Sequence, residues 1–432
     1  MRYFLSALLL SATALSPAAA KPRLNNSEMT YQLACLDETR SYEDKVDLCT
    51  AALEDARLSE SDRQRLLLAL GDAQTVMQDF GSAHESFAKV LARKPDSAAA
   101  HAGIGWIYYN DDAFGDAVEK FRQAIALEGS SSNYAGLGGA LYRQSPELIE
   151  EALEALDTAT LLEPGYDWAW AEMGWILHSA GRSDEALDAF KEALKISPNY
   201  VFVLHNMAVA QNNAGQHAAA LETANHLLSL EDNYWMLLER ARALRELGRN
   251  MQALRDASAA IDQDPTPEDG YVSKAFSLEA MGLNGAAVEV YSSMPADVAR
   301  TDYSYYYEAL LLQDDGQATA ALAAAERAIA LDIGDYTNWE LKARILIAQE
   351  DYFAALSAAR QANTLLAESE WALLYQAIAL THLGQSEEAM ELYRQAHDLG
   401  LPPGATNWFV EHLVAMKLTK EAKEVRKIAR SE

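Results

Sequence analysis

Two amphipathic patterns follow one another in residues 168–198, which read WAWAEMGWILHSAGRSDEALDAFKEALKISP. In the first half, apolar residues surround Gly174 at helical spacing, with Trp170 four residues before it. In the second half, Phe190 has alanines on either side at the same spacing. A glycine separates the two patterns and Pro198 ends the second one, because proline cannot continue a helix. The stretch therefore predicts two helices joined by a tight turn.

The same offsets recur along most of the chain. Gly71 and Gly105 take the place of Gly174 and lie 34 residues apart. Gly138 belongs to a further unit, in which two extra residues near Pro146 lengthen the turn. Ten units begin near residues 64, 98, 131, 167, 201, 234, 268, 302, 336 and 370. In the later units alanine replaces this glycine, at Ala208, Ala241, Ala275, Ala309, Ala343 and Ala377.

Each unit has the residues that close helix packing requires. Counting from the start of a unit, the small residue at position 8 and an alanine at position 20 let the two helices approach each other. Large residues at positions 4, 7, 11 and 24 fill the space between neighbouring units. A glycine at position 15 ends the first helix, because glycine adopts the left-handed conformation at the lowest cost. Such units bury their apolar faces only against their neighbours.

The pattern resembles that of the tetratricopeptide repeat family, W-x2-L-G-x2-Y, then A-x3-F, then A and P, over residues 64–403. The resemblance implies an all-α, right-handed superhelical solenoid of antiparallel helix pairs, with about ten units of 34 residues. It also implies that one arc of each first helix lines an inner, concave wall that binds a protein or peptide segment.

The chain begins with features of a secretory signal peptide. Residues 1–20 contain Arg2, a mostly apolar run from Phe4 to Leu10 and three alanines at the end. The apolar run is too short to span a bilayer comfortably, although a retained membrane anchor is the alternative. No later run of apolar residues has the length of a transmembrane helix. We therefore expect a mature chain without a transmembrane anchor that is periplasmic or secreted after signal-peptide cleavage.

Residues 21–63 predict an N-terminal helical hairpin with the two cysteines of the chain. Cys35 and Cys49 each lie seven positions from Tyr42, the expected turn. Symmetric positions of antiparallel helices meet, and an exported protein encounters an oxidising environment. We expect a disulfide between them. Two free, buried thiols are the alternative.

Residues 404–432 leave the repeat register and become basic, predicting a helical cap. Leu418, Ala422 and Val425 share one helical face, and lysines and arginines surround them. The end of a solenoid needs a polar outer face, which favours a solvated cap. A contact for anionic lipid or an acidic partner is the alternative.

The net charge of −29 argues against nucleic acid as a partner, because an acidic surface repels a polyanion. Half of the residues are hydrophobic, so the chain is not a disordered polyelectrolyte.

The aromatic residues that do not fit the core pattern predict a binding groove. Wound at 100° per residue, positions 2, 5, 9, 12 and 13 of a first helix lie on a separate arc from the core positions. A large exposed apolar patch usually marks a binding surface, and aromatic side chains dominate interface hot spots. Mutual packing of these side chains, which narrows the superhelix, is the alternative. The predicted groove residues are Trp106, Tyr109, Tyr142, Trp168, Trp175, His178, Phe202, His205, Asn206, Asn212, Trp235, Arg242 and Arg245.

No arrangement of residues predicts a catalytic site, a metal or a cofactor. The nine histidines are scattered, and the glycines at 136–139 are not followed by the lysine and serine of a phosphate-binding loop. The sequence thus predicts an exported scaffold or adaptor that binds a protein or peptide in a bacterial cell-envelope assembly. A glycan-binding accessory of polysaccharide export or secretion and an enzyme with an unrecognised site are the alternatives.

Overall fold

The structure of the protein, a computed structural model, describes residues 31–429. The predicted signal peptide, the start of the N-terminal hairpin segment and the last three residues of the basic cap lie outside the described residues. The chain divides into two compact units, which meet in the sequence between Asp232 and Asn233. Between residues 31 and 429 every regular element is a helix, and no strand occurs.

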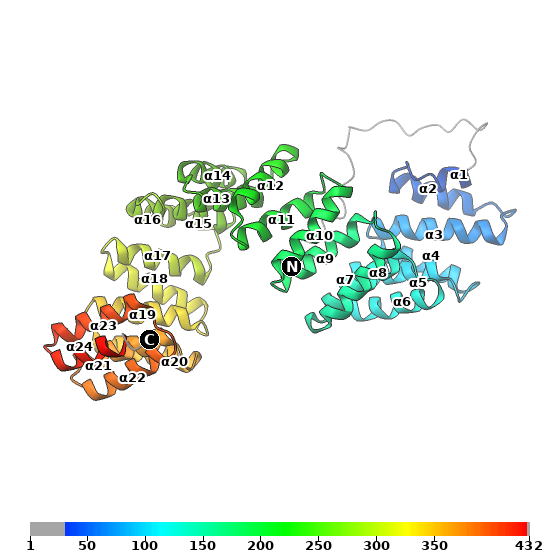
Figure 1. The fold of residues 1–432 in the computed structure, drawn as a ribbon. Helices are drawn as coiled ribbons and strands as arrows, with labels where there is room; N and C mark the ends of the chain where they lie inside the picture. Colours follow the sequence, from blue (N-terminus) through cyan, green and yellow to red (C-terminus); the bar gives the residue numbers. More distant parts are fainter. Residues whose placement is uncertain (1–30, 430–432) are drawn as a thin grey trace. The chain divides into compact units, whose positions relative to one another are not determined.

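The first unit contains twelve α-helices and one short 3-10 helix, η1, within its described residues. Its α-helices carry the labels α1 to α12 in Figure 1. They are α1 (Tyr31–Cys35), α2 (Tyr42–Leu53), α3 (Glu60–Val76), α4 (Phe80–Leu91), α5 (Ala98–Asn110), α6 (Phe114–Leu127), α7 (Ser131–Gln144), η1 (Pro146–Leu148), α8 (Ile149–Leu162), α9 (Asp167–Ser179), α10 (Ser183–Ile196), α11 (Val201–Asn213) and α12 (His217–Leu230).

The second unit contains twelve further α-helices within its described residues. They are α13 (Tyr234–Glu246), α14 (Asn250–Gln263), α15 (Glu268–Glu279), α16 (Asn284–Ser292), α17 (Asp302–Asp314), α18 (Ala318–Leu331), α19 (Tyr336–Ala348), α20 (Tyr352–Leu365), α21 (Glu370–His382), α22 (Ser386–Asp398), α23 (Pro403–Ala415) and α24 (Thr419–Ile428).

Consecutive helices pack in pairs, and each pair packs against the next one within its unit. The first helices of the ten predicted repeats begin where the register predicts, except that α3 begins four residues before residue 64, at Glu60. The predicted all-α solenoid of helix pairs is therefore confirmed.

Glycines allow an aromatic ring to fill the space between neighbouring pairs. Phe87 of α4 is fully buried, and a Cβ atom on Gly71 would lie 2.7 Å from its ring. A Cβ atom on Gly103 of the next pair would overlap the same ring. The sequence pattern predicted the close approach at Gly71, position 8 of its unit. The structure adds Gly103, at position 6 of the following unit, as the second half of the socket.

In most units the turn between the two helices of a pair has a residue in the left-handed conformation at position 15. The φ angles there are 77° at Gly181 and Gly316, but also 61° at Gln78 and 62° at Glu350. This conformation destabilises a residue with a Cβ atom by about 1–2 kcal/mol. The repeat geometry therefore holds even where the sequence lacks glycine.

We expect Glu350→Gly to stabilise the protein by about 0.5–1 kcal/mol, because it removes the steric cost of the left-handed conformation while adding freedom to the unfolded chain. The matched control is Gly316→Ala, which places a Cβ atom at the same turn position and should destabilise by about 1 kcal/mol. Urea unfolding of the full chain measures both. Shifts of the two midpoints in the same direction would contradict this account of the turn.

The end of the described chain also keeps the repeat register, which corrects the expectation of a break at residue 404. Helices α23 and α24 pack together as a further pair. Lys417 connects them with a φ angle of 62° and lies 14 residues after Pro403, just as Gly384 lies 14 residues after Glu370. Ala422, at position 20 of this pair, is buried. The basic sequence had concealed a degenerate repeat.

Position 4 of several units tethers the preceding turn, a role that the sequence pattern did not predict. The indole Nε1 of Trp170 donates to the carbonyl oxygen of Pro164 at 3.2 Å, and that of Trp339 donates to the carbonyl oxygen of Ile333 at 3.1 Å. The hydroxyl of Tyr271 donates to the carbonyl oxygen six residues before it in the same way. Trp170, expected in the core, is therefore only partly buried.

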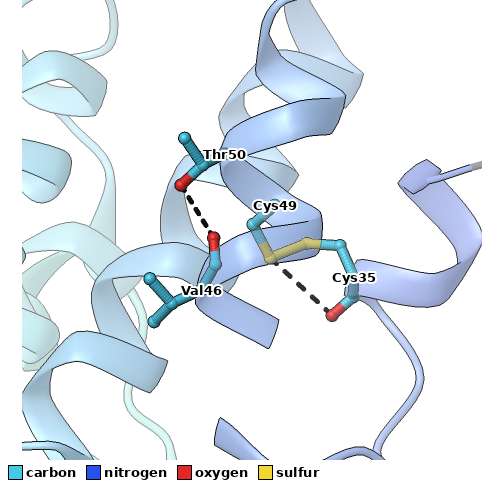
Figure 2. Close-up of a disulfide and its surroundings, with 4 residues drawn as sticks. All are labelled: Cys35, Val46, Cys49 and Thr50. Atoms are coloured by element: carbon cyan, nitrogen blue, oxygen red, sulfur yellow. Dashed lines mark hydrogen bonds between the residues drawn. A yellow bond between two sulfur atoms is a disulfide. The ribbon is translucent and has the colours of Figure 1, made fainter. Parts of the chain in front are cut away.

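A disulfide joins α1 to α2, as the spacing of the cysteines predicted (Figure 2). Cys35 is the last residue of α1 and Cys49 lies in α2, with a Cα–Cα distance of 4.9 Å. Both residues are fully buried, in a small core that includes Leu66 of α3. Tyr42, the expected centre of the turn, is instead the first residue of α2.

Candidate functional site

Five aromatic residues from three consecutive first helices gather in the first unit, and we name them the aromatic cluster: Trp106 and Tyr109 of α5, Tyr142 of α7, and Trp168 and Trp175 of α9. The ring centroids of Trp106 and Trp168 lie 5.4 Å apart, and Tyr109 lies 5.4 Å from Trp106 and 6.3 Å from Trp168. Tyr142 and Trp175 form a second group at 5.6 Å. All four pairs meet edge to face, the geometry that aromatic pairs prefer.

Arg143 of α7 connects the two groups of rings. Its guanidinium carbon lies 4.4 Å from the centre of the Trp175 ring and 5.0 Å from that of Tyr109. A guanidinium over an aromatic face contributes a favourable cation–π interaction, which is stronger where water is excluded. Only 15 % of the Arg143 side chain is exposed. The cluster is therefore held by a central cation as well as by ring packing.

A buried ion pair fixes that cation. Arg143 Nη1 donates to the Glu172 Oε1 atom of α9 and, at 3.2 Å, to the carbonyl oxygen of Gly139. The Tyr109 hydroxyl donates to the same carboxylate oxygen at 3.3 Å. Only 5 % of the Glu172 side chain is exposed. One carboxylate thus links side chains from α5, α7 and α9.

The electrostatics of Tyr109 agree with its role as a hydrogen-bond donor. Burial raises the pKa of its hydroxyl well above the ordinary value, and the negative charge of Glu172 raises it further. The hydroxyl therefore keeps its proton and donates to Glu172.

Sequence reasoning missed both members of the ion pair. Arg143 lies at position 13 of its unit, on the predicted arc, and Glu172 lies at position 6 of the next one, inside the apolar stretch WAWAEMGW. A carboxylate among core-facing residues is the signal that could have found the pair, because buried charges are normally paired.

One member of the aromatic cluster is buried, whereas an open groove predicts that all five side chains are exposed. Tyr109 is buried, because Trp106, Trp168 and Arg143 surround it. Tyr109 is therefore not part of the exposed surface of the cluster, and its contact with a partner stays a prediction. Trp106, Tyr142, Trp168 and Trp175 are packed on their neighbours but remain partly exposed.

The other predicted residues of the first unit lie on α9 and α11. Asn206 Nδ2 donates to the carbonyl oxygen of Phe202 at 2.8 Å, so this contact engages its amide within the helix. Asn212 is buried, with its Oδ1 3.3 Å from the His217 ring, so it is not exposed on the predicted groove. Phe202, like His178 and His205, is partly buried.

Three predicted residues belong to α13 in the second unit. Trp235 is exposed and meets the Tyr234 ring at 5.0 Å, and Arg242 pairs with Glu239 at 4.0 Å. Arg245 lies over the Phe276 ring at 5.4 Å, and burial, reinforced by the charge of Arg242, lowers its pKa.

Family profiles described as tetratricopeptide repeat match residues 68–133, 168–200 and 371–398. The chain is a tetratricopeptide repeat protein. The matched ranges cover helix pairs from both units, and the remaining pairs follow the same register.

Solved structures similar to this tetratricopeptide repeat protein have low sequence identity to it. One is a tetratricopeptide repeat protein from Parabacteroides merdae, at 16% identity and a TM-score of 0.48, covering 58% of this chain and 99% of that chain. Yeast Tom70 has 16% identity and a TM-score of 0.47, covering 90% and 96%. PilF of Pseudomonas aeruginosa has 20% identity and a TM-score of 0.45, covering 50% and 98%. No curated protein sequence matches the chain.

No group of three or more His, Cys, Asp or Glu side chains between residues 31 and 429 is arranged to hold a metal ion. In the same range, none of the helices combines the length and the apolar character needed to cross a membrane.

Proposed function

We propose that this tetratricopeptide repeat protein is an exported adaptor that binds a partner protein or peptide segment through the aromatic cluster, in a bacterial cell-envelope assembly. The observation that carries the proposal is the set of four partly exposed aromatic rings on consecutive first helices, held in place by the Arg143–Glu172 ion pair. The sequence of residues 1–20 and the bridge between Cys35 and Cys49 support export, because disulfides persist in oxidising compartments.

The packing of the rings favours tight binding. Association costs free energy for every side chain that must be ordered, about 0.5–1.5 kcal/mol each. Trp106 and Trp168 are already ordered by their mutual contact, and Trp175 is ordered by Tyr142 and Arg143. Burial of the exposed parts of these rings by a partner therefore adds little to the ordering cost of association.

A protein or peptide suits this surface better than a glycan. A sugar ring stacks on the open face of an aromatic side chain. The guanidinium of Arg143 covers one face of Trp175, and Trp106 and Tyr142 each meet a neighbouring tryptophan ring edge to face. Segments with side chains that fit between rings match this arrangement better than saccharides, which need an open ring face. None of the contacts between described residues favours the enzyme alternative.

Truncation of Trp175 tests the proposal. The partner is first identified by site-specific cross-linking in native envelope extract and then purified. We expect Trp175→Ala to weaken its binding by 2 kcal/mol or more, about thirtyfold, because a central aromatic side chain is lost. Calorimetry with the purified partner measures the affinity, and thermal unfolding measures the stability.

Trp170→Ala is the matched control on the same helix. It removes a tryptophan that tethers the preceding turn through Pro164, outside the aromatic cluster. It should lower the unfolding temperature and leave the affinity within about twofold. Unchanged binding by Trp175→Ala, or equal loss in both variants, would refute the aromatic cluster as the binding surface. Capture of oligosaccharide in place of protein would support the glycan alternative.

A further inference from the structure

One helix of the second unit is much shorter than its counterparts. Helix α16 has nine residues, whereas α14 and α18, the second helices of the neighbouring pairs, have fourteen each. Pro295 follows shortly after its end, at position 28 of the unit instead of position 32. Proline in a helix interior removes a hydrogen bond and clashes with the preceding turn, so α16 cannot continue.

A cavity of about 590 Å³ lies where the missing part of α16 leaves α17 and α18 uncovered. Its lining includes Tyr291 at the end of α16, Val298 in the loop that follows, Tyr305 of α17 and Leu331 at the end of α18. Volumes of about 300–1,000 Å³ are typical of pockets for small molecules. The pocket therefore has the size to hold a small molecule.

One wall of the pocket is a neutral ion pair. Arg300 Nη2 lies 2.7 Å from Glu308 Oε2, and both side chains are largely buried. Arg300 also lies 3.8 Å from the centre of the Tyr305 ring and donates to the Ser304 hydroxyl. Its charge and its hydrogen bonds are thus satisfied within the protein, so Arg300 positions Tyr305 and leaves the pocket without net charge on this side.

The remaining charged residue of the lining does not belong to this ion pair. Arg327 of α18 is exposed and lies 5.8 Å from the Tyr305 ring. It forms no ion pair with the carboxylates of residues 31–429. The lining therefore has a net positive charge of one, from Arg300, Arg327 and Glu308, in a chain with a net charge of −29. A guanidinium is well suited to bind a carboxylate through two parallel hydrogen bonds.

A second polar group of the lining lacks a partner. Tyr291 is only 2 % exposed, and its hydroxyl has no hydrogen-bond partner in the part of the chain that the structure describes. Buried hydroxyls are normally hydrogen-bonded, so such a group needs an explanation. Burial raises its pKa, so the hydroxyl remains a donor.

We propose that this pocket binds a small carboxylate with an apolar body. Arg327 binds the carboxylate group at the mouth, while Val298, Met294 and Leu331 contact the body. A ligand of about 8–20 non-hydrogen atoms in all suits the volume. The proposal is independent of the aromatic cluster, whose residues belong to the first unit. A negative result for the pocket therefore does not count against binding at the aromatic cluster, and the reverse also holds.

Ligand-observed NMR of the full chain with octanoate and its neutral analogue octanamide tests the proposal. We expect octanoate to bind with a Kd of about 1 mM or tighter, the range for a ligand of ten non-hydrogen atoms. Octanamide should bind at least about tenfold more weakly, because it lacks the charge that strengthens hydrogen bonds to Arg327. Arg327→Gln should weaken octanoate binding by about tenfold.

Arg255→Gln is the matched control, because Arg255 is another exposed arginine of the second unit that does not line the pocket. It should leave octanoate binding within about twofold. Both variants alter exposed residues and should fold normally. The proposal is overturned if octanoate does not bind, if octanamide binds equally well, or if Arg327→Gln binds octanoate as the unaltered protein does.

Discussion

Glu172→Ala is expected to lower the free energy of unfolding of the first unit by about 3–5 kcal/mol. The substitution removes the carboxylate that pairs with Arg143 and accepts from the Tyr109 hydroxyl. The cost arises mainly from what remains, a largely buried guanidinium without its counter-charge and a buried hydroxyl without its acceptor. Chemical unfolding followed by tryptophan fluorescence measures the loss, because Trp175 contacts Arg143 and Trp168 contacts Tyr109.

An exposed ion pair of the same unit gives the matched control. Arg122 and Glu151 also connect neighbouring helix pairs, but about half of each side chain is exposed. Glu151→Ala should cost less than about 1 kcal/mol, since water already screens that pair. The double variant Arg143→Met/Glu172→Leu should recover part of the stability lost by Glu172→Ala, because it leaves no unpaired charge. Equal losses for Glu172→Ala and Glu151→Ala would show that burial does not strengthen the first pair.

The helix pairs could be predicted from the sequence because each repeat specifies its own packing locally. Gly71, Gly105 and Gly174 lie at the same position of their units, and each faces the same position of the second helix of its unit. The pattern of one unit is therefore enough to predict the packing within the others. The turn at position 15 is even less dependent on residue type, as Glu350 and Lys417 adopt it without glycine. The short α16 also had a signal in the sequence, the early Pro295, but no pattern specifies the cavity that follows from it.

The candidate site could be predicted only in part, because its contacts join different units. Helical winding predicts that Trp106 and Trp175 share a side of their helices. It does not give the offset between neighbouring pairs, and this offset decides whether Tyr109 is open or buried. The Arg143–Glu172 pair depends on the same offset, since its members lie 29 residues apart on α7 and α9.

Loss of the bridge between Cys35 and Cys49 should lower the local stability of the α1–α2 hairpin by about 3 kcal/mol. The bridged residues are 14 positions apart, and a cross-link over such a loop restricts the opened state of the hairpin. Among the described residues the hairpin packs mainly against α3, at one end of the first unit, so it can open without the rest of the solenoid. Hydrogen exchange of the α2 amides measures the effect, with an expected acceleration of about a hundredfold.

Two ways of removing the bridge separate the cross-link from side-chain packing. Reduction with dithiothreitol keeps both sulfur atoms in the small core beside Leu66, whereas the double variant Cys35→Ala/Cys49→Ala removes them. If the cross-link dominates, both should accelerate exchange in α2 to a similar extent. Exchange in α9, several helix pairs away, should not change, because stability in a repeat array passes only between neighbours. Acceleration in the double variant alone would assign the stability to packing of the sulfur atoms, and unchanged exchange in both would show that α1 and α2 hold together without the bridge.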